Sequence, residues 1–526
     1  MVTKDNDKQS YPRYSMHKYW GKKPAAAVKP LISEYTSNGD VVLDPFSGYG
    51  VFCCEAYIAG RSVIANDLNP IANFITSTLF EKHIDINKVN RIWEQILKEF
   101  KPFVEEWYNI NIDGTIITPI SILRSSDNKP LKLTYKSGRN TITFDIPQDL
   151  ANAFLQKENN SFISDWYPNE EVIPNSRISA TQGMCIGDLF TKRTLSCHAR
   201  LLSLIEKYAD GNEKDLFLLA FTANLANCSK LVPPIKSRGD IAQGAWMTGF
   251  YIGETYIENN VLHYYTNRLN KAIKGKEDYL SCFKDAVNLF SPSAEVHDSF
   301  YKISNDDAKH LKIEDNSIDY VFTDPPYGDT VPYFEQSAFW NAWLKLKPDY
   351  SQEIVISDSN ERGKDISTFE RDIFQAISEI RRVLKPNKYF SITYHSLSGL
   401  EWKAITNACV LNDFKVVKFE WLEQKTYPPR QLNRLKTIKG DVLVTFVKSE
   451  EKTHKYRIRD EQLKLQMLNL ISVTINVGVR DTNSIMMTIM EWVLRDGIVI
   501  DSLDVFEVLN KNFKIGEDGL WMLIED

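Results

Sequence analysis

The feature that most constrains the fold is a strand, a glycine-containing turn, a helix and a second strand in direct succession. The apolar run 41–43 leads into a turn that ends at Gly50, a helical stretch follows over about 51–59, and the apolar run 62–65 is the second strand. Two strands joined through a helix form a βαβ unit, which requires a parallel sheet with helices on its faces. We therefore predict an α/β protein.

Strand patterns of the same kind return much later in the chain. The apolar run 318–322 leads directly into Asp324-Pro325-Pro326-Tyr327. A helical pattern over about 368–384 stops before Pro386, and three more strands are expected at 389–394, 414–421 and 441–448. Between about 80 and 300 the alternation is lost, so we predict a large α+β domain inserted into one Rossmann-like sheet.

This pattern predicts four parts. The segment from 450 to 477 contains neither Gly nor Pro, which favours a small, mostly helical module at the end of the chain. The expected parts are a first sheet segment at 11–80, an inserted domain at 81–300, a second sheet segment at 301–448 and the helical module at 449–526.

Charge and cysteine content limit the class of protein. The net charge is −6, whereas a small protein that is permanently bound to nucleic acid is usually basic. An enzyme that visits DNA can confine its positive charge to one cleft. Seven scattered cysteines without a CxxC pair argue against a disulfide framework or a zinc site, so no metal is expected. The polar N-terminus and the lack of a long apolar run predict a soluble cytoplasmic protein with no membrane partner.

The turn after the first strand has the composition of a nucleoside-cofactor site. Gly48 and Gly50 lack a Cβ, so the backbone can turn tightly and approach a ligand. Asp67 ends the next strand, where a carboxylate can accept both hydroxyls of a ribose. No third glycine follows at dinucleotide spacing, and Asp44 precedes the turn, which suits the cationic amino-acid end of S-adenosylmethionine better than a pyrophosphate. The alternative is an ordinary βα turn with a capping Asp.

The segment after the later strand has the groups needed to activate an exocyclic base amine. Such an amine attacks poorly, because its lone pair is delocalised into the ring. Asp324 and the Pro325 carbonyl can each accept one amine hydrogen, and Pro325 and Pro326 fix the backbone that holds them. Tyr327 offers a flat face to a base taken out of the stack. The alternative is a proline-rich turn.

These segments resemble the motifs of the DNA amino-methyltransferases, which modify adenine N6 or cytosine N4. The cofactor motif corresponds to Asp44-Pro45-Phe46-Ser47-Gly48-Tyr49-Gly50, and the catalytic motif to Asp324-Pro325-Pro326-Tyr327. The stretch 17–24 resembles the region that closes over the methionine end of the cofactor, and Asp307 resembles the acid that holds its adenine amine. The resemblance implies S-adenosyl-L-methionine as cofactor. The expected cofactor-binding residues are Asp44, Pro45, Phe46, Gly48, Gly50, Asp67, Asn69 and Asp307.

The resemblance also implies double-stranded DNA as substrate, with the target base flipped out of the helix. Because the catalytic motif follows the insertion, target recognition is expected within the insertion, and a second basic stretch lies between the last two strands. A cognate restriction or phage-defence partner is a further expectation. The DNA-binding candidates are Lys192, Arg193, Lys230, Arg238, Arg430 and Arg434, with solvated surface charge as the alternative.

The expected activity is DNA methylation at an exocyclic amine, with adenine N6 preferred because the catalytic motif begins with Asp, by family resemblance. Cytosine N4 stays open. An RNA guanine-N2 methyltransferase is the alternative within enzymes, since Gly328 after Tyr327 matches that class and departs from large bacterial DNA methylases. A catalytically silent nucleic-acid-binding subunit is the alternative outside enzymes.

Overall fold

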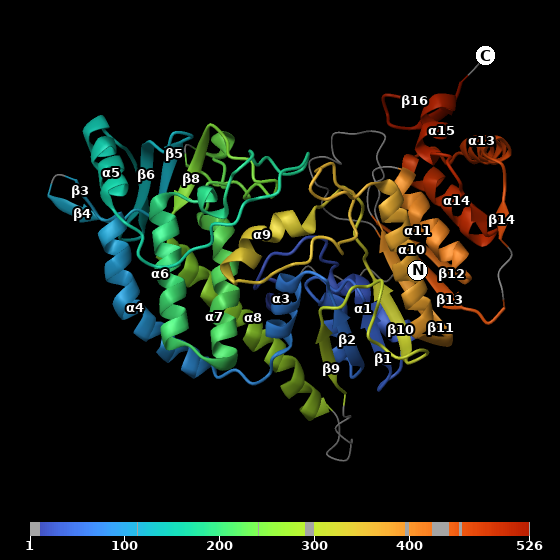
Figure 1. The fold of residues 1–526 in the computed structure, drawn as a ribbon, viewed down its shortest axis with the longest axis horizontal. Coiled ribbons are helices and arrows are strands. Elements are labelled where there is room, and N and C mark those ends of the chain that lie inside the picture. The colour runs from blue at the N-terminus through green and yellow to red at the C-terminus, as the bar shows by residue number, and fades with distance from the viewer. Residues whose placement is uncertain are drawn as a thin grey trace. The chain divides into compact units, whose positions relative to one another are not determined.

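The computed structural model describes residues 11–524 except 113, 240, 290–298, 395–398, 423–440 and 452–454. The chain divides into two compact units, and each is described by itself (Figure 1). Unit 1 comprises Met1–Trp20, Asn69–Glu295 and Tyr333–Pro348, and unit 2 comprises Gly21–Leu68, Val296–Pro332 and Asp349–Asp526.

Unit 2 is built on a seven-stranded sheet of order β12-β13-β11-β10-β1-β2-β9. The strands β11, β10, β1, β2 and β9 pair in parallel, and β13 pairs antiparallel with both of its neighbours. This mostly parallel sheet confirms the predicted Rossmann-like α/β class. The strands are β1 (Val41–Asp44), β2 (Ser62–Asn66), β9 (Tyr301–Ser304), β10 (Ile318–Thr323), β11 (Leu384–Tyr394), β12 (Phe414–Leu422) and β13 (Asp441–Lys448).

The two motif-bearing strands are direct neighbours in this sheet. β1 and β10 run parallel in a register that pairs Val42 with Tyr320 and Leu43 with Val321. β1 ends at Asp44 and β10 at Thr323, so the turns that follow both strands open at the same edge of the sheet. Carboxyl ends of parallel strands are where open α/β sheets bind their ligands.

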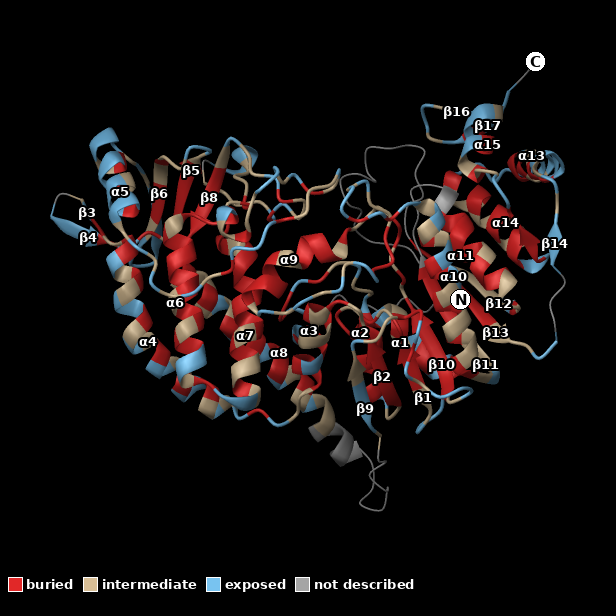
Figure 2. Cartoon of the chain, viewed as in Figure 1, coloured by how far each residue is buried: buried red, intermediate tan, exposed pale blue. Residues whose placement is uncertain are grey.

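Helices cover this sheet because their apolar residues recur at helical spacing. In α10, Phe369, Ile373, Ile377 and Ile380 are all buried, and the carboxylate of Asp365 caps the helix by accepting the Thr368 N–H at 2.8 Å. Figure 2 shows the sheet strands themselves as mostly buried. The helices of this part are α1 (Ala25–Tyr35), α2 (Val51–Ile58), α10 (Ile366–Val383) and α11 (Gly399–Leu411).

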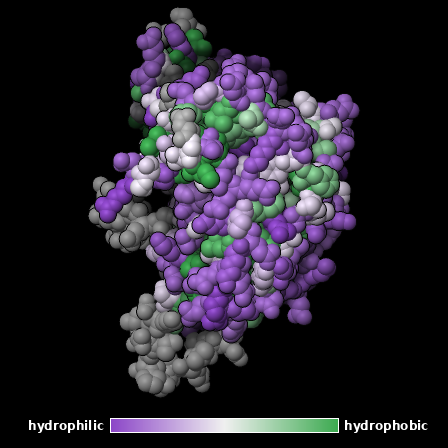
Figure 3. Space-filling view, turned by 90° about the vertical axis from the view of Figure 1, so that its left-hand side faces the viewer, coloured by the Kyte–Doolittle hydropathy of each residue, from purple (hydrophilic) through white to green (hydrophobic). Residues whose placement is uncertain are grey.

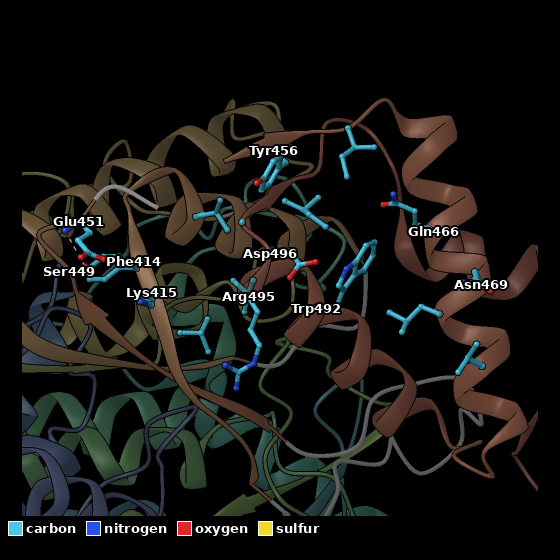
Figure 4. A pocket seen from close by; sticks show the side chains of 18 residues that line it. Phe414, Lys415, Ser449, Glu451, Tyr456, Gln466, Asn469, Trp492, Arg495 and Asp496 are labelled. Carbon is cyan, nitrogen blue, oxygen red and sulfur yellow. Dashed lines mark hydrogen bonds between the residues drawn. The ribbon is translucent and has the colours of Figure 1, made fainter. Parts of the chain in front are cut away.

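The C-terminal tail belongs to unit 2, and its apolar side chains join the same hydrophobic cluster as those of the sheet. A pocket of about 1030 Å³ opens between β12 and the tail helices, lined by Phe414, Tyr456, Trp492 and Arg495 among others (Figure 4). None of the motif residues lines this pocket. The tail elements are β14 (Tyr456–Arg457), α13 (Asp460–Asn476), α14 (Thr482–Arg495), β15 (Ile498–Val499), α15 (Val505–Asn512), β16 (Phe513–Ile515) and β17 (Trp521–Leu523).

Unit 1 is an α+β body, as predicted for the insertion, with an antiparallel sheet of order β7-β6-β5-β8. Its helices are α3 (Pro70–Phe80), α4 (Ile86–Tyr108), α5 (Gln148–Asn160), α6 (Lys192–Tyr208), α7 (Gly211–Leu225), α8 (Val261–Leu289) and α9 (Tyr333–Trp343). Its strands are β3 (Ile110–Ile112), β4 (Thr115–Ile117), β5 (Ser121–Ser125), β6 (Pro130–Ser137), β7 (Asn140–Asp145) and β8 (Thr255–Asn259). Its 3-10 turns are η1 (Pro12–Tyr14), η2 (Ile186–Leu189), η3 (Ala226–Cys228) and η4 (Lys236–Arg238).

The face drawn in Figure 3 is mostly hydrophilic, with apolar patches among the polar side chains. Within the described part of the chain, no helix is both long enough and apolar enough to cross a bilayer. The division into four parts that the sequence predicts stays a prediction, although three short stretches outside 81–300, namely 1–20, 69–80 and 333–348, group with the insertion.

Candidate active site

The glycine turn after β1 adopts the backbone geometry that its composition predicts. Gly48 has φ 51° and Gly50 has φ 81°, a left-handed region that residues with a Cβ avoid. Gly50 caps the amino end of α2, and the Ser47 N–H donates to the Asn66 carbonyl at 2.9 Å. The turn is therefore fixed between β1 and β2, with the amino end of a helix directly behind it, where partial positive charge accumulates.

Asp44 is a buried acid at the carboxyl end of β1, with 4% of its surface exposed. Its Oδ1 accepts the Phe46 N–H at 3.1 Å and the Thr323 hydroxyl at 3.3 Å. Burial, and then the nearby charges of Asp324 and Asp67, raise the pKa of Asp44 well above its usual range. A buried carboxylate of this kind has a strong preference for a cationic partner.

Two further acids mark the edge formed by the neighbouring strands β2 and β9. The Oδ2 of Asp67 accepts the Gly48 N–H at 2.8 Å, so this carboxylate also supports the glycine turn. β9 pairs with β2, and Asp307 follows it, with Oδ1 accepting the Lys309 N–H at 2.9 Å and Oδ2 lying 3.3 Å from the Lys309 Nζ. Asp44, Asp67 and Asp307 thus follow three adjacent strands, β1, β2 and β9.

Asp324 follows β10 and lies in a dense polar network. Its Oδ1 accepts the Thr393 hydroxyl at 2.8 Å and the hydroxyl of Tyr327, and its Oδ2 lies 3.0 Å from the Lys23 Nζ. Burial raises the pKa of Asp324 to about 6, Lys23 opposes this rise, and Asp441 adds to it. The leading acid of the catalytic segment is therefore held in place from three directions.

Lys23 lies in the stretch 17–24 and was not predicted to contact the catalytic segment. Its Nζ lies 2.8 Å from Asp441 Oδ2 and donates to the Tyr327 hydroxyl at 3.3 Å. Burial lowers the pKa of Lys23, but the two carboxylates outweigh burial and leave that pKa above its ordinary value. The ammonium therefore stays charged between Asp324 and Asp441.

Asp441 and Thr393 were missed for a topological reason. Asp441 is the first residue of β13, which runs antiparallel to β11, so its amino end lies at the edge where the parallel strands end. Thr393 lies near the end of β11 at the same edge. A strand that begins with Asp is a weak signal in sequence, because only the strand direction brings that residue to the site.

Gly328 occupies a position that excludes larger residues. It has φ 57°, and a Cβ there would lie 2.5 Å from the Glu401 Cγ and 3.0 Å from the Ile356 Cδ1. Pro325 is buried, Pro326 is half-buried and Tyr327 is 9% exposed. Glycine after the catalytic segment therefore follows from local packing, whichever nucleic acid is the substrate.

The DNA-binding candidates of the insertion have different surroundings, and Arg193 was predicted wrongly. Its side chain is 1% exposed and lies 3.2 Å from both Glu158 and Glu258, in a buried ion-pair cluster with Arg124, so it cannot reach DNA. Its position in the first turn of amphipathic α6 puts it on the helix's buried face.

The other predicted residues are placed as follows. Lys192 is half-buried and donates to the Asn159 carbonyl at 3.2 Å, and Arg238 is exposed in η4. Lys230 is half-buried, and burial lowers its pKa. Asn69 is the first residue of a unit 1 segment, where its buried amide donates to the Ser337 hydroxyl at 2.9 Å, and its role in cofactor binding stays a prediction. Arg430 and Arg434 lie outside the described residues.

Comparisons with known proteins agree with these motifs. The family described as DNA methylase, of the N6/N4 type, matches residues 2–76. The type II methyltransferase M.MjaII of Methanocaldococcus jannaschii is 22% identical over 350 residues, which cover 62% of this chain and 61% of that protein. The match thus spans less than two thirds of the relative's length.

Two solved structures show weaker likeness. A SAM-dependent methyltransferase from Methanosarcina mazei is 14% identical, with 33% of this chain and 79% of that chain covered and a TM-score of 0.17. A SAM-dependent O-methyltransferase from Thermotoga maritima is 10% identical, with 64% and 94% covered and a TM-score of 0.16. TM-scores this low carry no argument about this chain, whose fold follows from its own strand order.

Over its cofactor motif the chain is thus similar to the DNA methylase family, and over 350 residues it is similar to a type II methyltransferase.

Proposed function

We propose that this chain transfers a methyl group from S-adenosylmethionine to an exocyclic amine of a DNA base, with adenine N6 as the preferred target. The observation that carries the proposal is the position of Asp44 and Asp324 at the ends of neighbouring parallel strands. A donor site and an acceptor site at one sheet edge meet the geometric requirement of direct transfer, because the two reactants must lie within contact distance.

The donor side consists of acids with different surroundings. Buried Asp44 would bind the α-amino group of the cofactor, since burial and neighbouring acids favour a cationic partner there. Asp67 would accept hydrogen bonds from the ribose hydroxyls, and Asp307 would accept one from the adenine amine. Phe46, which is partly buried against the core, would line the cofactor site. The bound cofactor supplies a methyl group on a sulfonium, which is intrinsically electrophilic.

The acceptor side would activate the base amine by accepting its hydrogens. Asp324 and the Pro325 carbonyl would each accept one, which draws the nitrogen toward tetrahedral geometry and frees its lone pair. Asp324 must be ionised for this role, and its pKa near 6 leaves it mostly ionised at neutral pH. A flipped base would stack on Tyr327, whose hydroxyl is tied to Asp324 and Lys23.

The choice of adenine rests on the family resemblance of a catalytic segment that begins with Asp, and cytosine N4 is the alternative target. Guanine N2 of RNA is the alternative by resemblance alone, because the segment Asp-Pro-Pro-Tyr-Gly matches the form of that class, and the packing of Gly328 does not discriminate between the two substrates. Transfer of tritiated methyl groups to duplex DNA and to tRNA separates the two substrates. Sequencing that detects modified bases in DNA from expressing cells then identifies the base.

The decisive variant is Asp324→Ala. We expect it to abolish methyl transfer while S-adenosylmethionine still binds, because Asp324 belongs to the acceptor side. Asp315→Ala removes an acid whose side chain is 68% exposed in the same unit and serves as the matched control. Activity of Asp324→Ala within threefold of the wild type would refute the assignment.

A further inference from the structure

The catalytic acid lies in a buried network of three charged groups. Lys23 Nζ lies 3.0 Å from Asp324 Oδ2 and 2.8 Å from Asp441 Oδ2, and the three side chains are 11%, 14% and 6% exposed. The Lys23 ammonium therefore lies between two carboxylates that are mostly screened from solvent. A buried charge without compensation is costly, so each member of this network depends on the other two.

The surroundings of Asp324 push its ionisation in opposite directions. Lys23 favours the carboxylate, whereas burial and Asp441 favour the neutral acid, so its pKa near 6 is a balance. Among the described residues, Tyr327, which is bonded to Asp324, and Asp44, at the end of the neighbouring strand, also face the network. Removing Lys23 or Asp441 should therefore shift this balance in opposite directions.

We propose that Lys23 and Asp441 are positioning residues for Asp324: Lys23 holds the catalytic carboxylate ionised and oriented, and Asp441 anchors Lys23. The proposal rests on the function proposed above. Lys23 donates also to the Tyr327 hydroxyl at 3.3 Å, so the same ammonium fixes the carboxylate and the ring on which the base would stack. Lys23 immediately precedes Pro24, the residue before α1, which restricts the backbone from which this side chain extends.

The test is the pH dependence of kcat for Lys23→Met and Asp441→Asn with saturating DNA and S-adenosylmethionine. Activity needs ionised Asp324, so in the pH profile kcat should rise with pH as Asp324 loses its proton. This low-pH part of the profile is called the acid limb. Loss of Lys23 should move that limb to higher pH by about one unit or more, the usual effect of removing an opposite charge at this distance. Loss of Asp441 should move it to lower pH, because a like charge is gone and Lys23 pairs with Asp324 alone.

The control is Lys29→Met, which removes another lysine that pairs with a buried carboxylate, Glu55, at 3.4 Å in the same unit. The acid limb of the pH profile of Lys29→Met should stay where it is in the wild type. The acid limb of Lys23→Arg should shift less than that of Lys23→Met. Limbs that stay in place, or move in the same direction, would overturn the proposal. Wild-type protein that methylates no nucleic acid would instead contradict the proposed function, so the two failures are distinguishable. Thermal unfolding and calorimetric cofactor binding show whether each variant is folded.

A second, independent observation lies in unit 1. A pocket of about 210 Å³ is lined by Lys18, Arg268, Asn227 and Trp246, among others. Burial, and then the charge of Arg268, lower the pKa of Lys18, and burial lowers the pKa of Arg268. No carboxylate within the described part of the chain forms an ion pair with either cation.

We infer that this pocket binds a phosphate group, and on the proposed function that group is a phosphodiester of the DNA backbone. Two cations that repel each other in one pocket favour an anion between them, and the volume suits one phosphate. The Lys18 Nζ lies 4.4 Å from the centre of the Trp246 ring, and Arg268 Nη2 donates to the Asn227 Oδ1 at 3.0 Å, so both side chains are held at the pocket.

The test compares Lys18→Met and Arg268→Met with Lys271→Met, an exposed cation on the same helix as Arg268. Duplex DNA affinity is measured against salt concentration. Each pocket variant should weaken binding and reduce the log–log salt slope by about 1, as one lost phosphate contact does, whereas Lys271→Met should not. Unchanged slopes would overturn the inference for DNA. If the pocket variants lose orthophosphate binding but keep their affinity for DNA, the ligand is free phosphate, and the inference for DNA is overturned as well. Wild-type protein without DNA affinity would contradict the proposed function.

Discussion

Replacing Asp44 with Asn tests the donor half of the site, because it removes the charge and preserves the local hydrogen bonds. Both of the bonds described for its side chain fall on Oδ1, from the Phe46 N–H at 3.1 Å and the Thr323 hydroxyl at 3.3 Å. The amide oxygen of Asn can accept both. The glycine turn should therefore keep its shape, and any change in binding reports on charge.

We expect Asp44→Asn to weaken S-adenosylmethionine binding by roughly 1.5 to 3 kcal/mol, the value of a hydrogen bond to a charged group. This corresponds to roughly 10- to 150-fold in Kd. Isothermal calorimetry measures it directly. The control ligand is methylthioadenosine, which lacks the amino-acid end of the cofactor and should bind both proteins equally. A variant that binds S-adenosylmethionine within threefold of the wild type would refute the role of Asp44.

The same substitution should have the opposite effect on the stability of the cofactor-free protein. Burial raises the pKa of Asp44 in the folded state above its value in the unfolded chain. The ionised carboxylate therefore destabilises the fold at neutral pH, and this cost decreases as pH falls through the folded pKa. Asp44→Asn should raise the free energy of unfolding at neutral pH and raise it less in acid, as urea titrations at several pH values would show. Equal or lower stability at neutral pH would contradict this reasoning.

Three other variants test separate parts of the structure. Asp67→Ala should weaken cofactor binding by roughly 1.5 to 3 kcal/mol, and unchanged calorimetric affinity would place the ribose elsewhere. Gly328→Ala should have a lower kcat, because a φ of 57° costs alanine about 1–2 kcal/mol and its Cβ would collide with Glu401. The control Gly363→Ala has the same φ but no atom near its Cβ, so it should keep its activity. Equal kcat values for the two variants would refute the packing argument. Arg193→Met should destabilise unit 1 by about 3–5 kcal/mol in urea denaturation, since it removes one of the two arginines that Glu158 and Glu258 share in a buried cluster. A loss below about 1 kcal/mol would argue against that cluster.

The sequence predicted the fold class because the relevant signals are local. The succession of strand, glycine turn, helix and strand over 41–66 requires a parallel sheet, and α10 lies at Ile366–Val383 where the helical pattern predicts it. The positive φ values of Gly48 and Gly50 follow from the same local chemistry. The site prediction rests on residues that directly follow strands, and strand ends are visible in sequence.

The sequence could not separate buried from exposed charges. Arg193 was taken as a DNA contact because its charge is visible in sequence, whereas Glu158 and Glu258, which neutralise it, come from distant elements. Asn69 lies three residues beyond the second strand, and the contact of its amide with the Ser337 hydroxyl is equally invisible in the sequence. Burial depends on contacts between remote segments, so no local pattern of either residue predicts it.

By itself, the sequence predicted six of the seven strands of the sheet, all except β9, together with the glycine turn and the two acids, Asp44 and Asp324, that follow strands. Only the tertiary structure decided that β1 and β10 are neighbours, and that Lys23 lies between Asp324 and Asp441. The physical reason is that local chemistry sets backbone conformation, whereas strand order and direction determine which distant side chains share one buried space. An antiparallel β13 brings its first residue to the edge where the parallel strands end, and a parallel one would take it to the opposite edge.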